Sequence, residues 1–325
     1  MTTRHHPIDI QSLLRFERKS IAAALNLIED RRPARQEQAL TLLDELSTHA
    51  ALAHVVGVTG PPGVGKSSLI SRLIEIAARN NRRLAIVAVD PSSKISGGAL
   101  LGDRGRMQAP QHAPVYIRSF AARDRLGGLS REAFSAVFLL RHFCDMVIVE
   151  TVGVGQSETD IAHIADTVVL IIQPFSGDLL QFIKAGVMEI PDVLAVNKAD
   201  DEALARKALA DVKAALSYEQ QPWARPVLAV SAATNLHLED LDSAISSHYK
   251  HLVAQNSLQK RRTDQTSAWA ISEILHEVGR RGLLALGGPD EVQDLWKKQP
   301  AHWSETHHLE VLLQTVHWRK GKEQS

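Results

Sequence analysis

The chain has 325 residues, of which 44% are hydrophobic and 23% charged, as in a globular protein with one large domain or one medium domain with extensions. Lysine and arginine together number 37, as do aspartate and glutamate, so the formal net charge is zero. This balance argues against a general binder of nucleic acid or of anionic membranes, and the single cysteine, Cys144, excludes an internal disulfide and a cysteine-rich zinc site.

Residues 1–50 predict an N-terminal helical extension. They begin with MTTRHHPIDIQ, which lacks the apolar core of a signal peptide, and the chain contains no run of about 18 apolar residues that could cross a membrane. Apolar residues then recur near the period of a helix in two stretches that Pro33 separates. We therefore expect a cytoplasmic protein whose first 50 residues form a helix, a break and a second helix.

Residues 51–255 alternate between short apolar runs and helical patterns. The apolar runs, which are rich in β-branched residues, are 54–59, 84–89, 146–151, 167–173, 193–197 and 226–232. The helical patterns are 66–80, 129–143, 178–190, 201–218 and 238–253. Continuous apolar runs are typical of strands buried on both faces of a parallel sheet. The expected fold is therefore α/β, with a mostly parallel sheet flanked by helices.

Residues 256–325 show no further strand pattern. Two helical patterns, 267–286 and 307–318, are separated by Gly287 and Gly288. A helical tail of this kind either packs on the α/β domain or serves as an assembly arm.

The segment GPPGVGKSS at residues 60–68 matches the phosphate-binding pattern G-x-x-x-x-G-K-[ST], and it lies between an expected strand and an expected helix. Its glycines would let consecutive backbone N–H groups point at a phosphate, and the helix N-terminus adds partial positive charge. Lys66 can act on the β- and γ-phosphates, and the Ser67 hydroxyl can hold Mg²⁺. The residues predicted to form this loop are Gly60, Pro61, Pro62, Gly63, Val64, Gly65, Lys66, Ser67 and Ser68.

The tetrapeptide NKAD, which follows the fifth apolar run, indicates that the base is guanine. Asp200 can accept hydrogen bonds from the ring N1–H and the exocyclic amine together, a pair that adenine does not offer, while Asn197 and Lys198 would brace the loop and cover the base. The segment VSAA, containing Ser231 and Ala232, fits a second guanine contact through a backbone N–H near Ala232. The expected cofactors are therefore GTP and GDP rather than adenine nucleotides.

Two acidic residues leave strand ends on the same edge of the expected sheet. Asp90 lies in AVDPSS and Glu150 in VETVGVGQSE, where ligands bind in open α/β sheets. We expect both carboxylates to face Mg²⁺ or its water ligands. Gly153 and Gly155 would permit the segment after Glu150 to rearrange with the bound nucleotide.

These motifs, together with GGALLGDRGRM, LGGLSRE and GDLLQFIKAG in the same order, resemble the MeaB/ArgK/MMAA family. Its members are P-loop GTPases that act as chaperones for adenosylcobalamin-dependent acyl-CoA mutases. The likeness runs from about residue 20 to residue 255. It implies a P-loop NTPase fold of the SIMIBI type, with helical extensions at both ends and a homodimer formed by the C-terminal helices.

The resemblance also implies roles for residues outside the nucleotide motifs. Asp103 matches a Mg²⁺-linked switch acid, Gln156 lies in the second switch, and Lys184 matches a lysine linked to partner-stimulated hydrolysis. Two positions depart from the family pattern: Asp124 stands where glycine is usual, and Leu179 where a second acidic residue is usual. These departures leave open which mutase is served, methylmalonyl-CoA mutase or a relative that acts on isobutyryl-CoA or 2-hydroxyisobutyryl-CoA.

The combined hypothesis is slow GTP hydrolysis that a mutase stimulates, with Lys184 as the stimulating cation. The alternatives for Lys184 and Asp103, a solvated helix charge and a plain loop carboxylate, stay open. Because the chain lacks D-x-H-x-x-G, we expect adenosylcobalamin on the partner.

Two other functions remain as alternatives. A nickel-delivery GTPase for hydrogenase or urease would suit the 15 histidines, although only two adjacent pairs occur and no cysteine accompanies them. A kinase for a small molecule or a transport protein would need ATP, and NKAD argues against that nucleotide.

Overall fold

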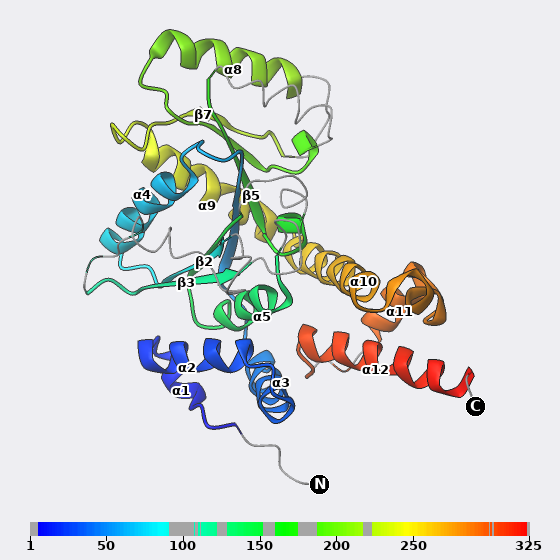
Figure 1. The fold of residues 1–325 in the computed structure, drawn as a ribbon. Coiled ribbons are helices and arrows are strands. Elements are labelled where there is room, and N and C mark those ends of the chain that lie inside the picture. Colours follow the sequence, from blue (N-terminus) through cyan, green and yellow to red (C-terminus); the bar gives the residue numbers. More distant parts are fainter. Residues whose placement is uncertain are drawn as a thin grey trace.

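The computed structural model describes residues 6–90, 107, 110, 112–121, 129–151, 160–174, 187–216, 223–298, 300 and 302–323. Its centre is a seven-stranded sheet in the order β3-β2-β4-β1-β5-β6-β7, and every neighbouring pair is parallel (Figure 1). The strands are β1 (His54–Thr59), β2 (Leu84–Asp90), β3 (Val115–Ala121), β4 (Met146–Glu150), β5 (Thr167–Ile172), β6 (Val193–Val196) and β7 (Val227–Ala229). The α/β prediction is confirmed.

Strand β3 is the part of the sheet that the apolar pattern missed. It lies at the edge, pairs only with β2 among the described strands, and its four residues 116–119 are half-buried rather than buried. Edge strands do not need a continuous apolar run, because one side and part of each face remain in contact with water. The sequence VYIRSFA lacks the continuous apolar run that the other six strands carry, including β7 at the opposite edge.

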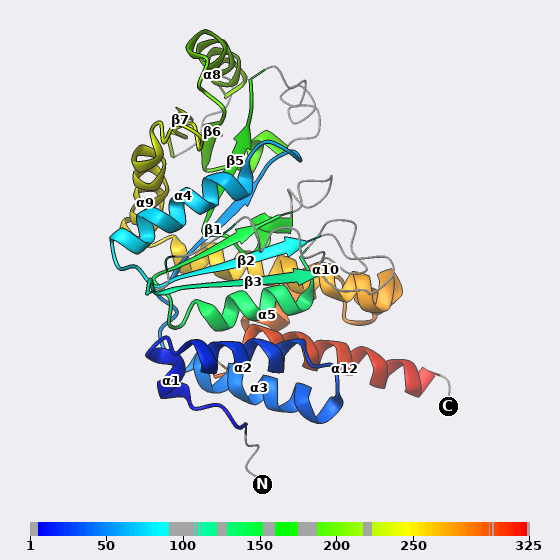
Figure 2. The same cartoon turned by 60° about the vertical axis from the view of Figure 1, so that its left-hand side comes forward.

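Helices cover both faces of the sheet, as Figure 2 shows. Helices α4 (Lys66–Arg79) and α9 (Leu238–Ala254) pack on one face, and α5 (Arg131–Leu140) packs on the other. Alternate residues of β1 divide between these faces, with Val55 in the core beneath α5 and Val56 and Val58 in the core beneath α4. Helix α8 (Glu202–Leu216) covers the β6–β7 end through a smaller apolar cluster.

The described N-terminal residues, from residue 6 onward, form three helices rather than two. Helix α1 (Ile10–Leu14) begins after Asp9, whose carboxylate accepts hydrogen bonds from the backbone N–H groups of Gln11 and Ser12. It ends before Phe16, whose φ of 62° interrupts the predicted first helix. Helix α2 (Arg18–Glu29) and helix α3 (Pro33–Ser47) follow, with Pro33 in the first turn of α3.

The part of the C-terminal region that the structure describes also contains one more helix than expected. Helix α10 (Leu258–Ala285) is interrupted at Gly279, and α11 (Pro289–Lys297) and α12 (Glu305–Glu323) follow. The short α11 was not predicted. No helix in the described ranges combines the length and apolar character that crossing a membrane requires.

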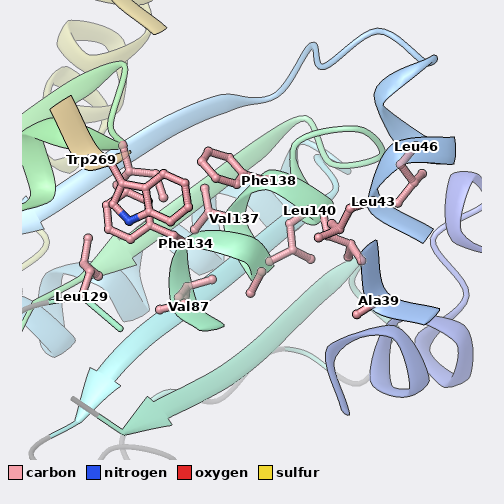
Figure 3. Close-up of a cluster of buried hydrophobic side chains, with 14 of the residues drawn as sticks. Ala39, Leu43, Leu46, Val87, Leu129, Phe134, Val137, Phe138, Leu140 and Trp269 are labelled. Atoms are coloured by element: carbon pink, nitrogen blue, oxygen red, sulfur yellow. The ribbon is translucent and has the colours of Figure 1, made fainter. Parts of the chain in front are cut away.

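One apolar core joins the two ends of the chain to the sheet. Trp269 of α10 stacks on Phe134 of α5 with 4.8 Å between ring centroids, and Phe138 meets the same indole edge-on at 5.4 Å (Figure 3). Leu43 and Leu46 of α3 belong to the same buried cluster. The N-terminal and C-terminal helices therefore lie on the α5 side of the sheet, with α5 between the strands and helices α2, α3 and α12 (Figure 2).

Candidate nucleotide-binding site

The predicted nucleotide-binding residues gather where the parallel strands end. In register, Glu150 at the end of β4 lies between Val58 of β1 and Ala88 of β2. The phosphate loop follows β1, Asp90 ends β2, and the NKAD segment follows β6. Parallel strands direct all these chain ends to one edge of the sheet, so side chains that are far apart in sequence converge there.

The phosphate loop depends on glycine at three positions. Gly60, Gly63 and Gly65 have φ values of 145°, 75° and 95°, which side chains rarely adopt. A Cβ on Gly60 would lie 2.2 Å from the carbonyl oxygen of Ile171, and one on Gly65 would lie 2.4 Å from Nδ2 of Asn197. The loop thus passes too close to β5 and to Asn197 for any other residue at these two positions.

Lys66 begins α4 and turns back over the loop. Its ammonium donates to the carbonyl oxygens of Gly60 at 2.9 Å and Pro61 at 3.1 Å, and the residue is only 7% exposed. Pro61 and Val64 are buried, whereas Pro62, Gly63 and Ser68 are exposed. The α4 N-terminus, with the lysine beside it, offers the positive charge that a phosphate requires.

Ser67, Asp90 and Glu150 are the described residues that could hold a cation. The Ser67 hydroxyl donates to Oε1 of Glu150 at 2.8 Å. Glu150 is 4% exposed and Asp90 is 1% exposed, and their strands β4 and β2 are neighbours. A hydroxyl and two carboxylates are hard oxygen ligands of the type that Mg²⁺ binds, directly or through water, so the residues present fit this ion.

Asn197 connects the phosphate loop to the last loop of the site. It is 2% exposed, and its Nδ2 donates to the carbonyl oxygen of Val64 at 2.8 Å. Its Oδ1 accepts from the backbone N–H of Ala232 at 3.4 Å. The side chain therefore contacts protein on both sides and links three segments of the site.

Lys198 lies across the phosphate loop. With φ of 59°, its backbone is in the left-handed region, and its exposed ammonium donates to the carbonyl oxygen of Gly63 at 2.8 Å and to Oε1 of Gln173 at 2.6 Å. Gln173 directly follows β5. Its contact with Lys198 was not predicted, because a glutamine after a strand has no motif of its own.

Asp200 is exposed and already oriented by hydrogen bonds. One oxygen, Oδ1, accepts from the Ser231 hydroxyl at 2.6 Å and from the Thr234 hydroxyl at 3.2 Å. Ser231 is fully buried, and its Oγ in turn accepts from the N–H groups of Ala233 and Thr234. This arrangement holds the carboxylate without a cation and leaves it able to accept from a base. Thr234 was missed by the sequence analysis.

Five predicted residues, Asp103, Gly153, Gly155, Gln156 and Lys184, lie outside the described residues, as do the departures at Asp124 and Leu179. The structure brings together the other predicted residues, from Gly60 to Ser68, Asp90, Glu150, Asn197 to Asp200, Ser231 and Ala232. A separate pocket of about 640 Å³ lies between α3, α5, α10 and α12, and none of the predicted site residues lines it.

The sequence of this chain is similar to that of a known protein family. The family model described as methylmalonyl-CoA mutase-associated GTPase MeaB matches residues 21–283. A putative GTPase of Pyrococcus horikoshii is 42% identical over 267 residues, which is 79% of this chain and 83% of the relative. The mitochondrial methylmalonic aciduria type A homolog of Caenorhabditis elegans is 33% identical over 286 residues, covering 82% of this chain and 72% of the relative.

A solved structure extends the likeness to the fold. The crystal structure described as LAO/AO transport system kinase superposes with a TM-score of 0.68 at 27% identity, covering 89% of this chain and 95% of that chain.

Proposed function

Because this chain belongs to the MeaB family of methylmalonyl-CoA mutase-associated GTPases, we propose that it is a GTP-dependent chaperone of an adenosylcobalamin-dependent acyl-CoA mutase. It is a P-loop GTPase. The family match, which covers most of the chain, carries the proposal and favours it over the nickel-delivery and kinase alternatives. The mutase is methylmalonyl-CoA mutase or a relative that acts on isobutyryl-CoA or 2-hydroxyisobutyryl-CoA.

The hydrolytic step uses the residues that follow the carboxyl ends of β1, β2 and β4. The N-terminus of α4 and Lys66 bind the phosphates, and the lysine ammonium exchanges loop carbonyl oxygens for phosphate oxygens when GTP enters. Mg²⁺ would be held by Ser67, with Asp90, Asp103 and Glu150 as its acidic partners, and it would neutralise charge on the β- and γ-phosphates. A water molecule then attacks the γ-phosphorus in line, releasing GDP and phosphate.

Base selection uses the loops after β6 and β7. Asp200 accepts from N1–H and the 2-amino group of guanine, and the backbone N–H of Ala232 donates to O6. Ser231 and Thr234 restrain the carboxylate before the base arrives, which reduces the cost of ordering it on binding.

Regulation by the partner is the remaining part of the proposal. Gln156 belongs to the second switch, and Lys184 stabilises the charge that develops on the γ-phosphate when the mutase docks.

The proposed domain organisation has three parts. Residues 1–50 form a helical extension, residues 51–255 the GTPase domain, and residues 256–325 an arm through which two copies form a homodimer. The protein acts in the cytoplasm, and adenosylcobalamin is bound by the mutase.

Replacing the base-reading carboxylate tests the GTP site. Asp200→Asn should lower GTP affinity by about 100-fold and raise affinity for xanthosine triphosphate, because the amide can donate to the 2-oxo group of xanthine. Asp201→Asn is the matched control, since this neighbouring carboxylate accepts from the N–H groups of Ala203 and Leu204 at the start of α8. Unchanged guanine preference in Asp200→Asn, measured by calorimetry, would contradict the proposed base site.

The chaperone role is tested with purified mutases. GTP turnover should rise at least about tenfold when the cognate acyl-CoA mutase is added, and Lys184→Ala should lose most of that rise while keeping basal turnover. Full stimulation of Lys184→Ala contradicts the role of this lysine. If none of the three candidate mutases binds the protein or changes turnover, the chaperone proposal is wrong. Tight binding of adenosylcobalamin to the isolated chain would contradict its placement on the partner.

A further inference from the structure

Helix α4 contacts the loop after β7, which contains Ala232, through a residue that belongs to none of the sequence motifs. Arg72 lies six residues after Lys66, and its Nε donates to the carbonyl oxygen of Ala232 at 3.0 Å. Its terminal NH1 donates to Oε1 of Glu75 one turn later, at 2.8 Å. The Arg72 side chain is 33% exposed, so the contact with Ala232 is partly shielded from water. The helix that carries the phosphate site is thereby bonded to the loop that follows β7.

The Arg72 contact complements that of Asn197. The two peptide groups on either side of the Ala232 Cα are held separately: Asn197 Oδ1 accepts from the Ala232 N–H, and Arg72 bonds the Ala232 carbonyl. Both backbone dihedrals of Ala232 are therefore restrained. The Asn197 bond is long at 3.4 Å, which leaves the N–H able to share a second, closer acceptor.

We propose that Arg72 is a positioning residue for base recognition, because it fixes the Ala232 backbone so that its N–H meets O6 of guanine. The inference rests on the proposed GTP site and adds a residue to it. O6 is the acceptor that distinguishes guanine from adenine, which carries an amine at that position. A donor that is held in place before binding discriminates better than a mobile one, because less order is lost when the base arrives.

The test removes the guanidinium and changes one atom of the ligand. Arg72→Met keeps an unbranched side chain but loses both hydrogen bonds, and GDP affinity should fall about fivefold. Arg79→Met is the matched control, since Arg79 lies on the same helix and pairs with Glu239 on α9, with both side chains 65% exposed. The control should bind GDP as the unmodified protein does.

The diagnostic probe is 6-thio-GDP, in which sulfur, a weaker acceptor, replaces O6 while N1–H and the 2-amino group remain. The unmodified protein should prefer GDP to 6-thio-GDP, and Arg72→Met should lose most of this preference. Glu75→Gln should lose part of it, because the carboxylate orients the guanidinium. If Arg72 acted only through general stability or positive charge, Arg72→Met would weaken the binding of both ligands equally. An unchanged ratio of GDP affinity to 6-thio-GDP affinity in Arg72→Met would therefore overturn the inference.

The outcomes separate this inference from the proposed function. If the unmodified protein does not bind GDP, the GTP site itself is wrong. If GDP binds and Asp200→Asn abolishes guanine preference, but Arg72→Met retains the full GDP to 6-thio-GDP ratio, only the role of Arg72 is wrong.

Discussion

Single residues shape the phosphate loop through backbone conformation as much as through side-chain chemistry. Gly60 and Gly65 combine left-handed φ values with neighbours that a Cβ would overlap, while Gly63 has the φ value but open space around it. The three glycines of one motif are thus required for different reasons. Two are constrained by both conformation and contact, and one by conformation alone.

This difference predicts unequal effects of alanine. Gly65→Ala should destabilise the protein by about 2–4 kcal/mol and abolish nucleotide binding, because the new Cβ meets Asn197 and displaces the residue that links the loops. Gly63→Ala, with nothing within 4 Å of its Cβ, should cost about 1–2 kcal/mol from φ strain alone. Urea unfolding and GDP titration of the pair measure the difference. Equal losses in the two variants would show that the contact with Asn197 is unimportant.

At the scale of elements, the second turn of α10 is bonded to the end of the sheet where the strands begin, opposite the nucleotide site. Arg262 donates to both oxygens of Asp166 at 2.8 and 2.7 Å, and to the carbonyl oxygens of Ala51 and Ala53. Asp166 is fully buried and also accepts from the N–H of Val55. The pair joins the starts of β1, β5 and α10, so it connects the C-terminal helices to the centre of the sheet.

Removing one member of this buried pair should be costly. Arg262→Met should lower the free energy of unfolding by about 3–5 kcal/mol, because it leaves the Asp166 carboxylate buried without its cation. The adjacent Arg261 pairs with Asp192 but is 27% exposed, so Arg261→Met should cost about 1 kcal/mol. Chemical denaturation followed by tryptophan fluorescence provides the comparison. Similar values for the two variants would mean that burial does not set the strength of these pairs.

Across the whole molecule, three histidines share one electrostatic property: His54 and His248, which are buried side by side, and the half-buried His142. Burial lowers the pKa of His54 to about 3 and the pKa values of His142 and His248 to about 4. His54 bonds Thr167 at 2.7 Å and stacks on Tyr249, and His248 bonds the same threonine at 2.8 Å. Asp166, Asp192 and Arg262 also act on this pair, but the cost of burying a charged imidazole exceeds the attraction of the carboxylates.

The protein should therefore lose stability in mild acid. Each imidazole binds a proton near pH 6.5 in the unfolded chain but only near pH 3–4 in the folded protein, so unfolding takes up protons between these values. Stability is highest above pH 6.5 and falls as the pH decreases towards 4, by up to about 1.4 kcal/mol per pH unit for each imidazole.

Urea unfolding at pH 7.5 and pH 5 measures this dependence. His54→Gln should reduce this dependence by the share of one imidazole, because His142 and His248 still contribute. A His54→Gln variant with the full pH dependence of the unmodified protein would contradict the contribution assigned to His54.

By itself, the sequence determined the features that depend on contiguous residues. The glycine-rich loop and the NKAD segment can be recognised because each is a local pattern with a local backbone requirement, and the inner strands because burial on both faces demands unbroken apolar runs. Tertiary structure alone decided the half-exposed edge strand β3, the break at Phe16 and the short α11. It also decided the contacts of Arg72 with Ala232 and of Arg262 with Asp166. Such contacts join residues about a hundred or more positions apart, and their energy comes from burial and partners that a linear pattern does not record.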